Sequence, residues 1–311
     1  MSHTHYVGSG PYCYANALAM MLGENAPSPA IIEFATSSAF GAEIVGENLA
    51  FFDPYGWTPL EGIDGALKAL GWESTLMVGM DEHDALGCLK DEVQKGPVFV
   101  GPVEMGYLTY QPGNKGPIGA DHYVVVLQVC EDIVELHDPH GHPYASLPVS
   151  DFMMAWRANT LGYGQPYMMR TNFRRVENIS EEDVIRRSIS VGLRWLSMEP
   201  RSDMPPGSAG NHEAVERLAK MIEKKYTRDL QGHLVYFAVR VGARRAADAA
   251  SCLARVGCPE AAGIMAKQAR FIGSLQYPLV KGDTTQAARI LRMLAPTYEE
   301  LRESLIKREA Y

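Results

Sequence analysis

The sequence predicts an α+β fold followed by a C-terminal α-helical domain, and three observations indicate this. Near the N-terminus, an irregular Gly/Pro segment turns into an apolar helical pattern. Between residues 121 and 138, two β-branched runs flank a polar break, which is typical of an antiparallel hairpin. After residue 176 the apolar periodicity is that of helices. We therefore expect an α+β domain over residues 1–176 and a helical domain over residues 177–311.

The first helix is predicted to begin at Pro11 or Tyr12 and to end at Gly23. Proline suits a first helical turn, and glycine commonly ends a helix. Cys13 therefore lies at a helix start, where unpaired N–H groups and the helix dipole stabilise a thiolate and an oxyanion. Taken alone, however, a cysteine is more typical of a core residue that only fills space. The apolar stripe of this helix consists of Ala17, Leu18, Met21 and Leu22.

The next elements follow from apolar periodicity and from the glycines and prolines at their ends. The sequence predicts helices over residues 27–40, 59–70 and 81–95, and strands over residues 74–78 and 97–103. A polar loop over residues 112–119 then leads to the hairpin.

The hairpin carries the second chemical signal. His122 stands at the start of its first strand, and Asp138 stands at the end of its second strand. Pro139 ends that strand because proline cannot donate to a β-ladder. A histidine and an aspartate at the same end of a hairpin are placed to interact.

The register of this hairpin decides whether the two side chains meet. Side chains alternate between faces, so His122 and Asp138 share a face only if the numbers of paired residues sum to an even value. A tight two-residue turn at residues 131–132 gives an odd sum and separates them. We therefore expect a three- or five-residue loop, or a bulge, that sets Asp138 opposite Val124 or Val126.

Downstream, the sequence predicts a helix over residues 181–196 and a Pro/Gly-rich linker over residues 199–208. One amphipathic helix is then marked by Val215, Leu218, Ala219 and Ile222. Further helices are predicted over residues 243–255, 261–275, 284–294 and 298–307.

Cys13, His122 and Asp138 suit the division of labour of thiol acyl transfer. The histidine takes the thiol proton, and the aspartate holds the imidazole in one tautomer and orientation. Three other histidines crowd the following turn and compete for a role in catalysis, zinc binding or substrate contact: His137, His140 and His142. A zinc site is disfavoured because these residues lie on a Pro/Gly turn without a second spaced pair of ligands.

Cys13 with Ala17-Leu18-Ala19-Met20, and His122-Tyr-Val-Val-Val up to Asp138-Pro139, resemble the papain-like fold of bacteriocin leader peptidases. The pattern is more similar still to the amino-terminal domain of the butirosin-biosynthesis acyltransferase family, whose strand and Leu-x-Tyr segment resemble residues 96–112. The resemblance covers the first half of the chain. It implies a helix-bearing lobe on an antiparallel sheet and a cysteine acyl-enzyme. It also implies acyl transfer from a carrier-protein thioester to an amine in secondary metabolism.

The residues of the oxyanion hole are not assigned by the resemblance. Papain-like peptidases commonly place a glutamine six residues before the cysteine, where this chain has Val7. The candidates to replace it, alongside the backbone N–H of Cys13, are His5, Tyr6, Ser9 and Asn16. A bond from Asn16 to the local backbone is an equal alternative. The candidate substrate-binding residues are Glu104, Tyr107 and His140.

Composition agrees with a cytoplasmic enzyme of two domains. The chain has 311 residues, 46% of them hydrophobic, without an apolar run of about 18 residues or a secretion signal. Five cysteines without metal-ligand spacing indicate reduced thiols, and neither a metal nor a cofactor is signalled. Apart from Cys13, the cysteines are interpreted as core residues: Cys88, Cys130, Cys252 and Cys258.

The net charge of −8 is divided unevenly, with −12 over residues 1–176 and +4 over residues 177–311. Two ordinary solvated surfaces would give this balance, and so would an acidic cleft for a polyamine-like acceptor with a basic face for an acidic carrier protein. The candidate basic residues are Arg186, Arg187, Arg244 and Arg245. Binding to nucleic acid or a membrane is disfavoured, and a homodimer is left open.

Three function classes therefore remain. The first is an amide-forming acyltransferase, and the second is a peptidase or amidase that uses the same acyl-enzyme. The third is a non-catalytic binding module, which the valine at position 7 favours.

Overall fold

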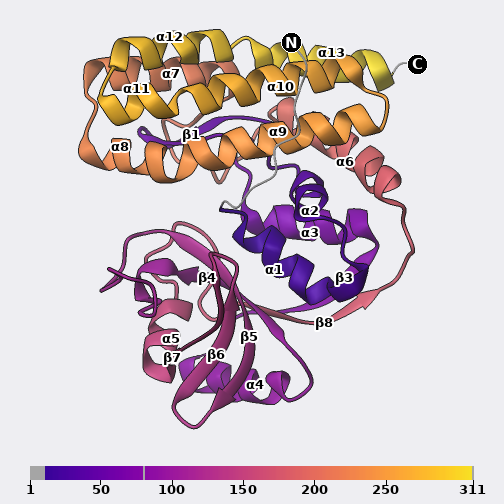
Figure 1. Cartoon of the computed structure of the whole chain (residues 1–311), viewed down its shortest axis with the longest axis vertical. Helices are drawn as coiled ribbons and strands as arrows, with labels where there is room; N and C mark the ends of the chain where they lie inside the picture. The colour runs from indigo at the N-terminus through magenta and orange to yellow at the C-terminus, as the bar shows by residue number, and fades with distance from the viewer. Residues whose placement is uncertain (1–10, 80, 310–311) are drawn as a thin grey trace. The chain divides into compact units, whose positions relative to one another are not determined.

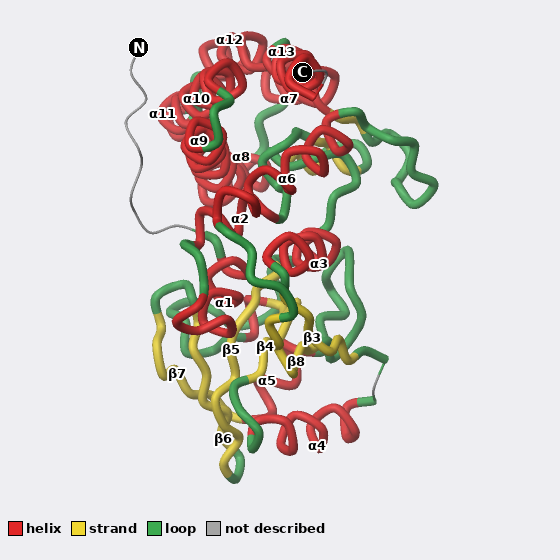
Figure 2. Tube along the Cα trace, turned by 90° about the vertical axis from the view of Figure 1, so that its right-hand side faces the viewer, coloured by secondary structure: helices red, strands yellow, loops and turns green. Residues whose placement is uncertain are grey.

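The computed structural model describes residues 11–79 and 81–309, and the chain divides into two compact units. The sheet unit consists of Tyr12–Pro29 and Gly71–Asn178. The helical unit consists of Ala30–Leu70 and the described residues from Ile179 onward. The fold is α+β with antiparallel sheets and a C-terminal helical region, as the sequence predicts (Figures 1 and 2).

The division at Asn178 lies close to the predicted boundary at residue 176, but Ala30–Leu70 groups with the C-terminal helices and not with the sheet. The cause is partly ionic. The buried Arg245 binds the carboxylates of Glu33 at 2.8 Å and Asp53 at 3.2 Å. The expectation that Arg245 lies on a basic docking face is therefore wrong.

A six-stranded antiparallel sheet organises the sheet unit, with strand order β3-β8-β4-β5-β6-β7. Its helices and strands are α1 (Cys13–Leu22), β3 (Trp72–Met77), α4 (Glu82–Val93), β4 (Val98–Glu104), β5 (Asp121–Cys130), β6 (Ile133–Asp138), β7 (His142–Pro148), α5 (Val149–Trp156) and β8 (Met169–Arg175).

One face of this sheet packs against α4 and α5, where its alternating valines form a core with Leu89 and Trp156. Helix α1 packs against β5 and β4. Its observed start at Cys13 and the left-handed Gly23 that follows Leu22 agree with the prediction from the sequence.

Strands β7 and β8 and helix α5 were not predicted from the sequence. The edge strand β7 contains Pro143 and ends at Pro148, and proline is tolerated in a sheet chiefly at an edge. Helix α5 has only eight residues, too few for a clear period. Strand β7 and helix α5 depend for their stability on the core cluster around Phe152 and Trp156.

The helical unit combines a bundle of helices with a small antiparallel sheet of order β2-β1-β9. Its elements are α2 (Pro29–Ala35), β1 (Glu43–Val45), β2 (Leu49–Phe51), α3 (Pro59–Leu70), α6 (Glu181–Leu196), β9 (Ala209–Gly210), α7 (Asn211–Lys224), α8 (Arg228–His233), α9 (Val239–Arg255), α10 (Pro259–Ser274), α11 (Gln276–Lys281), α12 (Thr284–Leu294) and α13 (Thr297–Glu309). A π-helical turn over Leu234–Ala238 joins α8 to α9.

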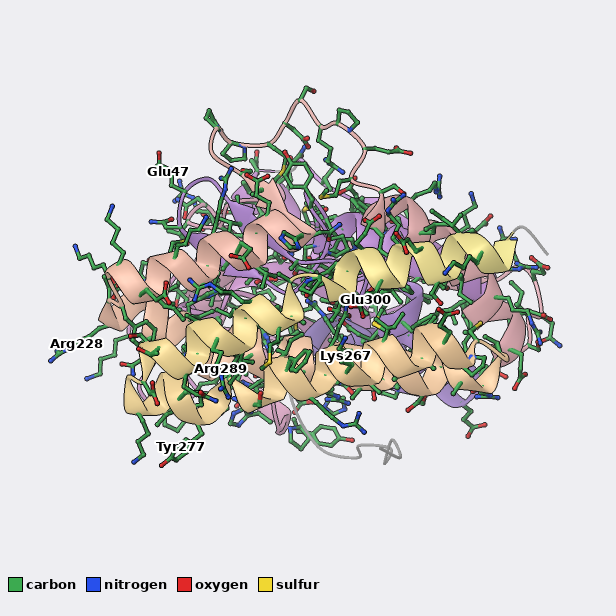
Figure 3. All side chains as sticks on the ribbon, turned by 90° about the horizontal axis from the view of Figure 1, so that it is seen from above. Glu47, Arg228, Lys267, Tyr277, Arg289 and Glu300 are labelled. Carbon is green, nitrogen blue, oxygen red and sulfur yellow. The ribbon has the colours of Figure 1, made fainter. Side chains whose placement is uncertain are left out.

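In Figure 3 the labelled Lys267 and Glu300 lie between α10 and α13, where their side chains pair at 3.0 Å. No helix among residues 11–79 and 81–309 is long and apolar enough to cross a membrane.

A buried carboxyl group makes the stability of the helical unit depend on pH. Glu43 is buried, and its Oε2 accepts a hydrogen bond from the Gly56 N–H at 2.7 Å. Burial, with the neighbouring Asp53 carboxylate adding, raises the pKa of Glu43 from 4.5 to about 9. The folded chain therefore holds a proton that the unfolded chain releases above pH 4.5.

We expect the stability of the helical unit to fall as pH rises from 4.5 to about 9, by up to about 1.4 kcal/mol per pH unit. Glu43→Gln, which is neutral at every pH, removes this dependence. Urea unfolding of both proteins across this range measures it, with Glu213→Gln on the exposed face of α7 as the matched control. Equal slopes for wild type and Glu43→Gln would contradict the assignment.

Candidate active site

The hairpin of β5 and β6 has the even register that the sequence argument requires. Its turn is the tight two-residue one, with Cys130 paired to Ile133, but the register shifts between Val126 and Gln128. Leu127 is the extra residue of this bulge, and beyond it the pair Val125–His137 sums to an even number. The prediction of a bulge is confirmed, and the same register sets Asp138 opposite Val124.

His122 and Asp138 form a hydrogen-bonded pair. His122 Nε2 lies 2.6 Å from Asp138 Oδ1, and the two residues are only 4% and 3% exposed. Burial alone would raise the pKa of the Asp138 carboxyl. The hydrogen bonds that it accepts, foremost from His122, outweigh burial and hold this pKa well below its usual value.

The ionised carboxylate fixes the tautomer of the imidazole. A carboxylate is an acceptor only, so His122 Nε2 carries the proton of this hydrogen bond. In the neutral ring, Nδ1 of His122 is then the unprotonated nitrogen, which is the form that a general base requires.

Cys13 is the first residue of α1 and carries a half-buried thiol. This position lies in the first turn of the helix, where backbone N–H groups have no carbonyl partner within the helix. The N–H groups of this turn and the helix dipole therefore favour negative charge at the position of Cys13.

An aromatic contact links the residue after Cys13 to the residue after His122. The ring of Tyr14, directly after Cys13, meets the ring of Tyr123, directly after His122, with centroids 5.9 Å apart and planes at 89°. Burial raises the pKa of Tyr123 well above its usual value, and the nearby charges of Asp121 and Cys13 raise it further.

Strand β4 passes close behind the histidine because it has a glycine there. The β4–β5 register shifts between Val100 and Val103. Within this bulge, Gly101 has φ +154°, and a Cβ on it would lie 2.9 Å from the His122 carbonyl oxygen and 2.4 Å from the Tyr123 ring. A side chain at position 101 would therefore displace the start of β5.

Of the candidate oxyanion residues, Asn16 is bound to the local backbone. Its Nδ2 donates to the Tyr12 carbonyl oxygen at 2.8 Å, which is the alternative role that the sequence left open. The other candidates lie outside the described residues: His5, Tyr6 and Ser9.

The candidate substrate-binding residue Glu104 lies inside the sheet unit. Glu104 is 0% exposed, and its carboxylate accepts hydrogen bonds from inside the sheet unit. The donors are the backbone N–H groups of Gly106, Ile118 and Gly119, at 3.0–3.2 Å, and the Thr160 hydroxyl at 2.5 Å. Glu104 thus anchors the connection between β4 and β5.

The other two candidate substrate-binding residues differ in burial and in their distance from the His122–Asp138 pair. Tyr107 is half-buried and packs against the core of the sheet unit. His140 is exposed, and its ring centroid lies 6.0 Å from that of His122. Its backbone N–H donates to Asp138 Oδ1 at 2.7 Å. His140 is therefore the one of the two that lies beside the candidate site.

Sequence reasoning missed two residues that bind Asp138. Tyr110 OH and Gln111 Nε2 donate to Asp138 Oδ2 at 2.9 Å and 2.8 Å. The available signal was their position in a polar segment just before a Pro/Gly loop, in the Leu-x-Tyr stretch that resembles the acyltransferase family.

The other four cysteines differ in burial. Cys252 and Cys258 are buried and Cys88 is half-buried, but Cys130 is exposed at the hairpin end, so the prediction that it fills a core is wrong. Among the residues that the structure describes, His, Cys, Asp and Glu side chains form no group of three arranged to hold a metal ion.

Comparisons with known proteins show sequence similarity to proteins described as YobF. Residues 205–306, in the helical unit, match the family model described as the YobF C-terminal domain. Over 307 residues the chain is 29% identical to a Bacillus subtilis (strain 168) protein described as "Uncharacterized protein YobF". This alignment covers 97% of the present chain and 98% of the relative, so the similarity extends over both units.

Proposed function

We propose that the sheet unit is a papain-like domain that transfers an acyl group through a Cys13 thioester. His122 is the general base and acid, and Asp138 orients it. The donor is an acyl-thioester, which the family resemblance makes a carrier-protein thioester, and the acceptor is an amine. The observation that carries the proposal is the buried His122–Asp138 hydrogen bond of 2.6 Å at the strand ends next to the helix that Cys13 begins.

The chemistry follows from the protonation states. Cys13 Sγ loses its proton to His122 Nδ1 and attacks the thioester carbonyl carbon. The donor's sulfur leaves as the tetrahedral intermediate collapses and takes the proton back from His122. The products of this half-reaction are an S-acyl Cys13 and the free thiol of the donor.

The second half-reaction returns the enzyme. An amine nitrogen attacks the acyl carbon and gives a proton to His122 Nδ1. The bond from carbon to Cys13 Sγ then breaks, and His122 protonates the sulfur. An amide and the Cys13 thiol result, whereas water in place of the amine gives a carboxylic acid and makes the same site a hydrolase.

Intact-protein mass spectrometry after exposure to a panel of acyl-thioesters tests the proposal. We expect wild type to gain the mass of one acyl group and Cys13→Ala to gain none. Cys130→Ala, which removes an exposed thiol of the same unit, should acylate as wild type does.

The fate of the adduct separates the two activities. Addition of a polyamine should clear the acyl-Cys13 adduct faster than buffer alone and yield the corresponding amide. Clearance at equal rates with and without amine would support the hydrolase. An unreactive Cys13 across the whole panel would contradict both activities and leave a binding module.

A further inference from the structure

The candidate site contains more hydrogen-bond donors than a histidine–aspartate pair needs. Asp138 accepts four hydrogen bonds, two at each oxygen. His122 and the backbone N–H of His140 bind Oδ1, at 2.6 Å and 2.7 Å. Tyr110 and Gln111 bind Oδ2, at 2.9 Å and 2.8 Å. Both oxygens are thus held, which fixes the rotation of the carboxylate as well as its charge.

We propose that Tyr110 and Gln111 are positioning residues that act through Asp138 to hold His122 in its Nε2–H tautomer. A carboxylate with one bound oxygen can turn about its Cα–Cβ and Cβ–Cγ bonds and release its partner. With Oδ2 bound by two donors, Asp138 keeps Oδ1 directed at His122 Nε2. The catalytic meaning of this inference rests on the proposed function, but the geometry does not.

Tyr110 is fixed in place as a neutral donor. Burial raises the pKa of Tyr110 far above its usual value, and the Asp138 carboxylate raises it further. Its ring packs against the core of the sheet unit and meets the ring of His142 with centroids 5.5 Å apart. The hydroxyl therefore keeps its proton and donates it to Asp138 Oδ2.

The segment that carries both donors is itself closely held. We call residues 105–119, between β4 and β5, the strap. Inside it, Gln111 N–H donates to the Leu108 carbonyl at 3.0 Å, and Asn114 Nδ2 donates to the carbonyls of Met105 and Leu108. Thr109 Oγ1 donates to Asp151 of α5 at 2.7 Å. These turns and side-chain contacts hold Tyr110 and Gln111 beside Asp138.

A close backbone contact closes the strap. Gly116 N–H donates to the Gly106 carbonyl at 3.2 Å. A Cβ on Gly106 would lie 2.0 Å from the Gly116 carbonyl oxygen, so only glycine allows this approach. Together with the anchor at Glu104, this contact makes the strap a fixed support for the candidate site.

Histidine-selective ¹⁵N NMR tests the inference on His122 directly. The variants are Tyr110→Phe, Gln111→Met and the double variant, which keep side-chain volume and remove only the donors. We expect the His122 Nε2–H to exchange at least about tenfold faster in the double variant than in wild type, because the hydrogen bond to Asp138 opens more often. We also expect part of the ring population to shift to the Nδ1–H tautomer.

Two control variants separate positioning from general stability. Tyr167→Phe removes a hydroxyl that donates to Glu82 in the same unit, and Gln128→Met removes an amide that donates to Glu135. Neither should change the tautomer of His122. In an Asp138→Asn or Asp138→Ala background, whichever is folded, the change caused by Tyr110→Phe should shrink, because it acts through Asp138.

The outcomes separate this inference from the proposed function. Unchanged exchange and tautomer of His122 in the double variant would overturn the positioning role, whatever Cys13 does. A faster exchange of the His122 proton with an unreactive Cys13 would uphold the positioning role and overturn the proposed reaction. A reactive Cys13 should in addition show a shifted pH profile of iodoacetamide alkylation in the double variant and an unshifted one in both controls.

Discussion

Asp138→Ala is expected to lower the acyl transfer that we propose for Cys13 on the order of a thousandfold or more. Without the carboxylate, His122 loses the acceptor that selects its Nε2–H tautomer. The substitution also leaves four donors around an apolar methyl group. We expect the sheet unit to lose on the order of 3–5 kcal/mol of stability, the usual cost of breaking a buried charged pair.

Asp138→Asn separates the effect on acyl transfer from the effect on stability. Asparagine keeps an acceptor oxygen for His122, while Gln111 and Tyr110 can turn to accept from its amide group. We therefore expect it to retain more acyl transfer and more stability than Asp138→Ala. Single-turnover acylation and urea unfolding measure the two quantities. Equal acyl transfer by wild type and Asp138→Ala would show that Asp138 does not orient the base.

The depressed pKa of Asp138 adds a pH dependence with a definite sign. A carboxyl with a lower pKa in the folded chain stabilises the fold above its unfolded pKa of 3.8 and loses this contribution as pH falls below it. Asp138→Asn should therefore unfold with a shallower dependence on acid than wild type.

Glu104→Ala is expected to cost about 3 kcal/mol of stability in the sheet unit, because three backbone N–H groups and one hydroxyl lose their acceptor. Although burial opposes it, hydrogen bonding foremost from Thr160 and the strap lowers the pKa of Glu104 below 4.5. The contribution of this carboxylate is thus present above pH 4.5 and is lost as pH falls.

Hydrogen exchange at the backbone of Gly106, Ile118 and Gly119 provides the local measurement. These amides should lose protection in Glu104→Ala and keep part of it in Glu104→Gln, which retains one acceptor oxygen. Glu82→Ala is the matched control, because its carboxylate accepts a hydrogen bond from the Tyr167 hydroxyl and not from the backbone N–H groups of the strap. Unchanged protection of the strap in Glu104→Ala would contradict the anchoring role.

Much of the helical region was predictable because its helices are strongly amphipathic. The predicted ends of α6 (Glu181–Leu196) and α12 (Thr284–Leu294) coincide with the observed ones. Ser180 and Asp283 cap these helices through their side chains, so local chemistry determines where they begin. The grouping of Ala30–Leu70 with these helices was not predictable, since it depends on the contact of Arg245 with Glu33, 212 positions apart.

The candidate site was predictable only in part for the same reason. The parity of the hairpin follows from strand alternation, so the approach of His122 to Asp138 could be stated as a condition on the register. The two donors to Asp138 Oδ2 could not be predicted. Tyr110 and Gln111 lie in a segment without periodicity, and only the folded strap brings them to the carboxylate. Likewise, the polar type of Glu104 indicates exposure, whereas its hydrogen bonds keep it inside.

The single extra residue in β5 constrains how this hairpin can change in length. Leu127 converts an odd pairing at the turn into an even one where the candidate site lies. Inserting two residues at the Glu131–Asp132 turn lengthens the hairpin and leaves His122 and Asp138 on a common face. Inserting one residue shifts the two strands by one position if the two-residue turn re-forms, and this turns His122 and Asp138 to opposite faces while leaving every side chain of the site present. With a tight turn kept, length variation in this hairpin is therefore compatible with the site only in steps of two residues, and an odd residue requires a longer loop or a second bulge.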